Sequence, residues 1–227
     1  MSNDFAELFQ SALLDVQSGE LEAAEVTLNQ LLSDPLQGEA EAAVCALLGM
    51  VEMYLGKTDL AVTRLQRSVR LSDGFADAHT NLCCALRLQG KDLDAAVRHG
   101  RRALEIRPDF PAGLLNLGNA YDAYGALNEA VVCFVEALKL QPEFPEALFG
   151  LGDTLRALGK LEGAIETYLQ ALGLRPDVLE AFIVLGDMLV EAEDSEGAIS
   201  AYQAALNIDP ENVEVHRSLS HCLQKRG

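Results

Sequence analysis

The sequence has no tryptophan, and aromatic residues make up only 6% of its 227 residues. Basic residues are also few: 17 Lys and Arg stand against 35 Asp and Glu, which gives a formal net charge of −18. Because an acidic chain repels phosphate, we expect neither a nucleic-acid partner nor binding to acidic membrane surfaces. Apolar residues, dominated by Ala and Leu, still reach 49%, which is enough for a continuous core of closely packed helices.

Long hydrophobic runs are absent as well. The longest, Ala42 to Val51, ends at Glu52 and falls far short of the roughly 20 residues that a membrane span needs. The first ten residues have no basic region and no apolar run, so we expect no signal peptide. The five cysteines are an odd number without metal-ligand spacing. We therefore expect a cytoplasmic protein with no membrane insertion, no metal and no cofactor.

What the sequence does contain is an internal repeat of 34 or 35 residues. Three kinds of marker residue recur at this spacing. The first is a Leu followed by a small residue, the second a single Ala, and the third a Pro. The Leu members are Leu48, Leu82, Leu117, Leu151, Leu185 and Leu219, the Ala members are Ala61, Ala96, Ala130, Ala164 and Ala198, and the Pro members are Pro108, Pro142, Pro176 and Pro210.

Residues 111–144 show why the period arises. Leu117 and Tyr121 fall on one face of a first helix, and Gly125 follows as a helix stop where the chain needs a positive φ. Phe134 lies on the apolar face of a second helix, which Pro142 prevents from continuing. Each repeat is thus predicted to be two antiparallel helices joined by a short turn. One such pair cannot bury its apolar face alone, so neighbouring repeats must stack.

This pattern resembles the tetratricopeptide repeat (TPR) family over nearly the whole chain. The resemblance rests on an ordered series of residues in 111–144, 145–178 and 179–212. The series starts with Leu-Gly, continues with an aromatic residue or Leu three positions later, and then has Gly, Ala, an aromatic Phe or Tyr, a second Ala and finally Pro. It implies an all-α, right-handed superhelical solenoid of antiparallel helix pairs, with about six repeats, as a single domain over 1–227. We place the repeats at 5–38, 42–75, 76–110, 111–144, 145–178 and 179–212, followed by a C-terminal helix at 213–226.

Some positions depart from the pattern. Residues 33–41 form a longer connection that contains Pro and Gly. Gly100 stands where other repeats have Phe or Tyr, so it removes a large core side chain and weakens the helix by about 1 kcal/mol relative to Ala. Glu193 occupies a turn position where Gly is expected, which predicts local strain or a different turn.

No constellation for catalysis stands out. The sequence contains no Gly-rich phosphate loop and no suggestive Ser/His/Asp arrangement, and His79 is interpreted as a partly buried structural residue. Cys83 and Cys84 are adjacent on a helix and point about 100° apart, so they cannot face one site together. We expect Cys83 to be buried and predict that the chain is not an enzyme.

The resemblance implies that first helices line a concave groove, and it assigns the groove-facing places. In the N-terminal repeats the groove-facing residues are mostly apolar, and their methionines make the surface adaptable. In the C-terminal repeats the groove-facing residues are mostly acidic, with two exposed apolar side chains among them. We therefore predict a scaffold or adaptor that holds a partner peptide or helix with basic and apolar residues. The predicted groove residues are Met50, Met53, Tyr54, Asn81, Arg87, Asn116, Asn119, Asp122, Glu146, Phe149, Asp153, Arg156, Ile183 and Asp187.

Alternatives remain open from the residues alone. Asn81 and Asn116 resemble the asparagine ladder of the repeats in O-linked N-acetylglucosamine transferases, so the chain could be the substrate-recognition region of a larger glycosyltransferase or sulfotransferase. The acidity could serve solubility alone, and the apolar N-terminal zone could mediate self-association. The arginines Arg98, Arg101, Arg102 and Arg107 could meet an acidic partner or the acidic end of another copy, or they could form a solvated, partly paired helix face.

Overall fold

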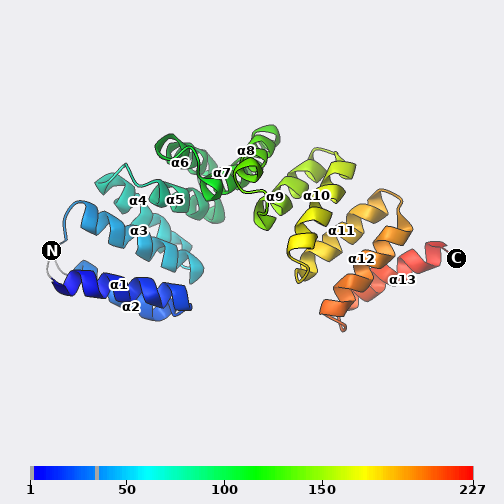
Figure 1. Ribbon diagram of the computed structural model, residues 1–227, viewed down its shortest axis with the longest axis horizontal. Coiled ribbons are helices and arrows are strands. Elements are labelled where there is room, and N and C mark those ends of the chain that lie inside the picture. Colours follow the sequence, from blue (N-terminus) through cyan, green and yellow to red (C-terminus); the bar gives the residue numbers. More distant parts are fainter. Residues whose placement is uncertain (1–2, 34–35, 227) are drawn as a thin grey trace. The chain divides into compact units, whose positions relative to one another are not determined.

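The computed structural model describes residues 3–33 and 36–226 of the chain. Over these residues it contains thirteen α-helices and no strand (Figure 1), which confirms the all-α fold class. Residues 34–35 of the longer connection expected at 33–41 lie outside the described residues. The helices are α1 (Asn3–Ser18), α2 (Leu21–Ser33), α3 (Glu39–Tyr54), α4 (Thr58–Leu71), α5 (Ala76–Gln89), α6 (Leu93–Ile106), α7 (Pro111–Tyr124), α8 (Leu127–Leu140), α9 (Pro145–Ala157), α10 (Leu161–Leu174), α11 (Leu179–Glu191), α12 (Ser195–Ile208) and α13 (Val213–Arg226).

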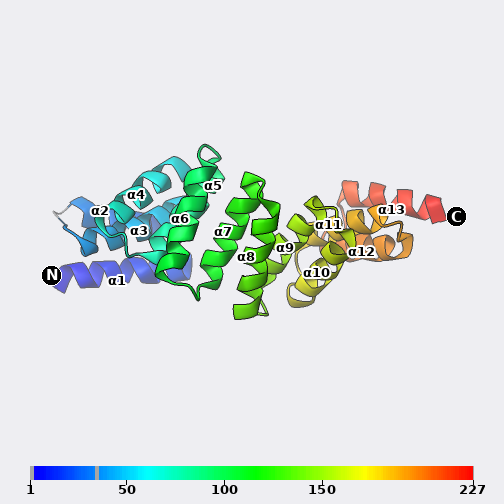
Figure 2. The same cartoon turned by 90° about the horizontal axis from the view of Figure 1, so that it is seen from above.

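The structure divides into two compact units, which are described separately. Unit 1 is Met1–Gly125 and unit 2 is Ala126–Gly227. In unit 1 each helix packs on the next, and the first helices of the repeats, α3, α5 and α7, also pack on one another. In unit 2 consecutive helices from α8 to α13 pack in order, and Figure 2 shows α11, α12 and α13 side by side. The prediction of a single domain with six repeats stays a prediction.

Helix ends follow the local sequence. Pro111 and Pro145 stand in the first turns of α7 and α9, where the missing N–H costs no hydrogen bond. Helix α6 ends at Ile106, ahead of Pro108, and α8, α10 and α12 end at the same distance from their own prolines. Helix α3 begins at Glu39, earlier than the expected repeat start at residue 42.

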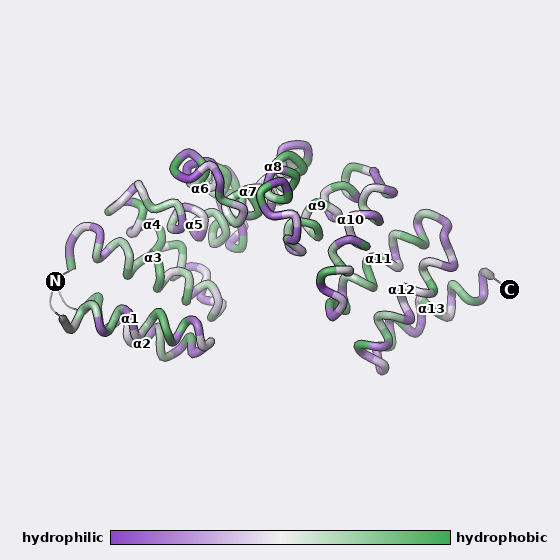
Figure 3. The backbone as a smooth tube through the Cα atoms, in the orientation of Figure 1, coloured by the Kyte–Doolittle hydropathy of each residue, from purple (hydrophilic) through white to green (hydrophobic). Residues whose placement is uncertain are grey.

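Hydrophobic and hydrophilic residues alternate along each helix (Figure 3), and the small residue after Leu lets the two helices of a repeat approach closely. A Cβ added to Gly49 would lie 2.6 Å from Leu65 Cγ of the second helix. At Gly186 it would lie 2.5 Å from Tyr202 Cε1. These distances are too short for real Cβ contacts, so any larger residue would push the helices apart.

Gly100 leaves no hole in the core, although it lacks the large side chain that other repeats carry at this place. A Cβ on Gly100 would lie 2.9 Å from Leu117 Cδ1 and 3.1 Å from Cys83 Sγ. Leu117 of α7 and the buried Cys83 of α5 therefore fill the space that Phe or Tyr takes in other repeats.

Glu193 is the only residue other than glycine with a positive φ in the described part of the chain, at 61°. Its turn matches the turns at Gly159 (φ 71°) and Gly125 (φ 87°), so the predicted strain is present but the turn is unchanged. Asp194 then caps α12, because its side chain accepts a hydrogen bond from Gly197 N at 2.9 Å.

A pair of histidines lies inside unit 1. His79 Nδ1 and His99 Nδ1 are 2.9 Å apart with their rings stacked, and His79 is only 2% exposed. Burial lowers the pKa of His99 to about 4, and neighbouring His79 and Arg98 act in the same direction. Burial also lowers the pKa of His79, although Asp73 Oδ1 lies 3.3 Å from its Nε2 and opposes the shift. The interpretation of His79 as a structural residue agrees with this geometry.

Replacing Glu193 with Gly should stabilise the protein by about 1 kcal/mol, because an L-residue in the left-handed region is strained. Urea unfolding followed by circular dichroism measures the change. The matched control is Gly159→Ala, which should destabilise by a similar amount at the equivalent turn. A Glu193→Gly variant no more stable than wild type would contradict the assignment of strain.

Acidification should weaken unit 1. The folded pKa of His99 lies below the usual 6.5, so its contribution is full above about pH 6.5 and is lost as the pH falls toward about 4. Below pH 6.5 the unfolded chain binds a proton at His99 that the folded chain does not, which destabilises the fold by at most roughly 3–4 kcal/mol. His99→Gln should flatten this part of the pH profile of the unfolding free energy. Parallel profiles for wild type and His99→Gln would contradict the prediction.

Candidate functional site

An open apolar cavity of about 630 Å³ lies in unit 1. Its walls come from the first helices α1, α3, α5 and α7 and from the residues just before α5 and α7. This is the face on which the groove was predicted, because first helices pack side by side. The lining residues are Phe9, Leu13, Ala43, Ala46, Leu47, Met50, Tyr54, Phe75, Asp77, Ala78, Thr80, Asn81, Phe110, Ala112 and Asn116.

Four of the predicted groove residues meet in this cavity: Met50, Tyr54, Asn81 and Asn116. Asn116 Nδ2 donates to Ala112 O of its own helix at 2.9 Å, so part of its amide is already engaged.

The other predicted groove residues of unit 1 lie outside this lining. Met53 is half-buried and packs against the core around Leu65 and Leu82. Arg87 is half-buried at the end of α5, and its Nε is enclosed without a hydrogen-bond partner among the described residues. Asn119 and Asp122 are half-buried on α7.

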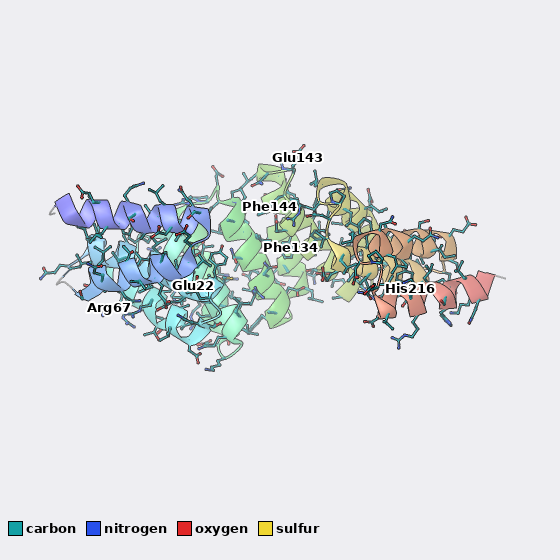
Figure 4. All side chains as sticks on the ribbon, turned by 90° about the horizontal axis from the view of Figure 1, so that it is seen from below. Glu22, Arg67, Phe134, Glu143, Phe144 and His216 are labelled. Carbon is teal, nitrogen blue, oxygen red and sulfur yellow. The ribbon has the colours of Figure 1, made fainter. Side chains whose placement is uncertain are left out.

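Sequence reasoning missed two aromatic walls of the cavity, Phe75 and Phe110. Each precedes the first residue of a first helix, at its N-cap position. Arg107 lies over the Phe110 ring, 4.4 Å from its centroid. The signal was present in the sequence, because Phe recurs just before three first helices. The third is Phe144 before α9, labelled in Figure 4.

Charge in the cavity wall is limited to Asp77, and that carboxylate is paired. Arg107 donates to both of its oxygens, at 3.2 and 2.8 Å. The exposed ion pair adds little stability by itself, but it leaves the cavity lining close to neutral. Asp77 and Thr80 were not among the predicted site residues, although they stand at groove-facing places of their repeat.

In unit 2 the second helices hold the two predicted aspartates in place. Tyr168 Oη donates to Asp153 Oδ1 at 2.5 Å, and Tyr202 Oη donates to Asp187 Oδ1 at 2.7 Å. Burial raises the pKa of both tyrosines, and the hydrogen bonds to the carboxylates raise it further. Phe149 packs edge-on against Tyr168, with ring centroids 5.3 Å apart. In both repeats the hydrogen bond joins an Asp on the first helix to a Tyr on the second helix.

Two arginines partly neutralise the negative charge of the predicted acidic wall. Arg175 Nη1 lies 3.3 Å from Glu146 Oε1. Arg156 Nη2 lies 3.4 Å from Glu191 Oε2, which joins first helices of successive repeats. Ile183 is half-buried and packs against the unit 2 core, so it offers only part of its side chain to a partner.

The arginines between 98 and 107 are engaged within the protein. Arg101 Nε donates to Tyr121 Oη at 2.7 Å, and Arg102 bonds Asp73 and Glu105. Arg98 reaches Asp92 at 4.0 Å. Together with the Arg107–Asp77 pair, these contacts fit the interpretation of a solvated, partly paired helix face.

In the described part of the chain, the His, Cys, Asp and Glu side chains form no cluster of three or more that could hold a metal ion. All five cysteines are described, and none forms a disulfide. Within residues 3–33 and 36–226, no helix has the length and apolar character to cross a membrane.

The fold and this face define the class as a helix-pair repeat protein. A family profile described as tetratricopeptide repeat matches residues 46–111 and 115–178, and one described as TPR repeat matches 186–227. These matches cover more than half of the chain, which therefore belongs to the tetratricopeptide repeat family. No curated protein matches the sequence.

Three solved structures illustrate the likeness in fold. PilW, a type IV pilus biogenesis factor, is 16% identical with a TM-score of 0.85, covering 96% of this chain and 100% of PilW. A thermophilic TPR protein of Thermus thermophilus is 21% identical with a TM-score of 0.64, covering 81% of this chain and 99% of that one. YrrB, a TPR protein with an unusual peptide-binding site, is 18% identical with a TM-score of 0.61, covering 78% and 91%.

Removing the hydroxyl of Tyr202 should destabilise unit 2 by about 1–2 kcal/mol, because Asp187 loses a hydrogen bond to its charged carboxylate. Urea unfolding of Tyr202→Phe measures the loss. Tyr54→Phe is the control, since Tyr54 is 68% exposed and its change should stay within about 0.5 kcal/mol. Equal stability of the two variants would show that the Tyr–Asp bond contributes nothing.

Proposed function

We propose that this protein is an interaction scaffold that holds a segment of a partner polypeptide on the face of its first helices. The observation that carries the proposal is the 630 Å³ apolar cavity built from four first helices of unit 1. A cavity of this size and apolar character is typical of ligand-binding sites. The chain binds rather than reacts in this proposal.

Two further features support a polypeptide as the ligand. Met50 gives the cavity an adaptable wall, since methionine repacks easily around different side chains. The peptide-binding site of YrrB, on a related fold, supports the same class of ligand by analogy.

For unit 2 we propose recognition of basic residues. Asp153 and Asp187 stand on successive first helices, each oriented by a tyrosine, so their carboxylates are fixed before a partner arrives. Arg175 and Arg156 reduce the charge contributed by Glu146 and Glu191. The electrostatic part of the proposal therefore rests on the two aspartates rather than on a uniformly acidic wall.

The alternative proposal is that the chain is the substrate-recognition part of a larger glycosyltransferase or sulfotransferase. Its support is that Asn81 and Asn116 line the same cavity, as two rungs of an asparagine ladder would. Gly150 and Val184 stand at the next two places, so the ladder would be short. The cytoplasmic location and the option of self-association both stay predictions.

Ala46→Arg should fill the unit 1 cavity and abolish partner binding without unfolding α3, because Ala46 is half-buried and Arg is a good helix former. Affinity capture from lysate with quantitative mass spectrometry compares it with wild type. Ala23→Arg is the matched control on the exposed face of α2 and should capture the same partners as wild type. Equal capture by all three proteins would overturn the proposed site.

Asp153→Asn combined with Asp187→Asn tests the basic-partner component in the same assay. Asparagine keeps an oxygen that can accept the tyrosine bond, whereas a change to Lys would also break that bond. We expect loss of partners whose capture by wild type weakens with salt. Unchanged capture of those partners would remove the electrostatic component and leave the apolar site.

A further inference from the structure

A smaller cavity lies in unit 2, beside one of the two Tyr–Asp pairs. It has a volume of about 230 Å³, and its walls come from α11, α12 and α13. The lining residues are Asp187, Val190, Tyr202, Ser218, His221 and Cys222. Solvent reaches this cavity, because His221 is exposed and Asp187 and Ser218 are half-buried.

The Asp187 carboxylate in this wall has one oxygen available to a ligand. Its Oδ1 accepts the hydroxyl of Tyr202 at 2.7 Å. Its Oδ2 makes no hydrogen bond or ion pair with a described residue, and it retains accessible surface. With histidine neutral, this carboxylate carries the single formal charge of the lining. A fixed negative charge without a counter-charge favours a cation at this place.

The preceding repeat supplies such a cation from its own chain. Arg156 follows Asp153 by three residues, as Val190 follows Asp187 one repeat later. Burial raises the pKa of Tyr168, the partner of Asp153, and the positive charge of Arg156 opposes that rise, so Arg156 lies near this pair. At the second pair the corresponding residue is Val190, which carries no charge. The cation that the first pair has within the chain is therefore missing from the second.

The cavity also has room and a suitable wall for the stem of a long cationic side chain. Ser218 and Cys222 stand where the preceding repeat pair has the larger Val184 and Met188. Val190 and the buried Cys222 give the cavity an apolar part beside the carboxylate. Lysine and arginine pack aliphatic stems against such surfaces while their charged ends meet a polar group.

We propose that the unit 2 cavity takes one lysine or arginine side chain of a partner polypeptide, with its cationic end bonded to Asp187 Oδ2. This inference rests on the proposed function and assigns its recognition of basic residues to one place, since Arg156 already lies near Asp153. A volume of 230 Å³ is below that of sites for drug-sized ligands, which suits a single side chain. Because two copies of a chain with a net charge of −18 repel each other, we assign the cation to a different polypeptide.

The test begins with Val190→Arg, which gives the second pair the arginine that the first pair has and should fill the cavity. A random peptide library displayed on phage is depleted on this variant and then selected on the wild-type full chain. We expect the recovered peptides to share a lysine or arginine. Recovery of peptides without a basic residue, or of none where the undepleted library gives binders, would overturn the inference.

Calorimetry then compares the best peptide with a twin that has norleucine in place of the lysine or citrulline in place of the arginine. Wild type should bind the charged peptide about 10-fold more tightly or better. Asp187→Asn should lose this preference, and the matched control Asp153→Asn should keep it. Equal loss in the two variants would show that general acidity attracts the cation. Twins with Lys and Arg exchanged identify which cation binds more tightly.

A second variant fills the cavity without adding charge. Ser218→Leu should weaken the charged peptide about 10-fold, whereas Ser220→Leu on the exposed side of α13 should not. Circular dichroism and thermal melting verify that these variants and Val190→Arg are folded. Wild-type affinity in a folded Ser218→Leu or Val190→Arg would overturn the cavity as the site.

The undepleted selection separates this inference from the proposed function. If it yields peptides that Ala46→Arg blocks and Asp187→Asn leaves unchanged, and the depleted selection yields none, the cation site is wrong and the proposed function stands. If neither selection yields a peptide, both are wrong. Self-association in sedimentation velocity that Asp187→Asn abolishes would overturn the assignment to a different polypeptide.

Discussion

The close contact between a small residue of the first helix and a large side chain of the second underlies every other feature of this protein. Gly152 and Gly186 lie against the rings of Tyr168 and Tyr202, where no Cβ would fit. This contact brings the two helices of a repeat together and fixes the face that each first helix presents. The cavity and the oriented aspartates depend on it, because both are built on first-helix faces.

The same contact links stability to binding in unit 2. A tyrosine that fills the space beside its glycine carries a hydroxyl that must be satisfied, and Asp153 or Asp187 satisfies it. The core thereby orients a carboxylate on the binding face before a partner arrives. In unit 1 the equivalent position is Leu65 in the second repeat, which carries no hydroxyl. The carboxylate on this face, Asp77, is instead paired with Arg107, and the rest of the cavity wall is mostly apolar, so the two units differ in the partner chemistry that we propose for them.

Much of the fold could be predicted from the sequence because its signals are local and repeated. The positions of proline and glycine predicted where helices end, and the recurring pair of Leu and a small residue predicted where the two helices of a repeat pack closely. Prediction of the site was less complete. Met50, Tyr54, Asn81 and Asn116 do meet in one cavity, but Phe75, Phe110 and Thr80 were missed. The missed phenylalanines lie just before the first helices rather than on their groove-facing stripe, whereas Thr80 stands at a groove-facing place that the prediction did not use.

By itself, the sequence determined the repeat, the all-α class and the family, since a period of 34 residues needs no knowledge of distant contacts. Tertiary structure decided how charges and polar groups are used. Formal charge suggested an acidic wall, but Arg175 and Arg156 lie against two of its members, and the arginines of α6 bond within the protein. These pairings join residues that are 20 to 35 positions apart in the sequence and that lie on or next to different helices. They depend on how the helices pack, so a linear pattern of charges cannot reveal them.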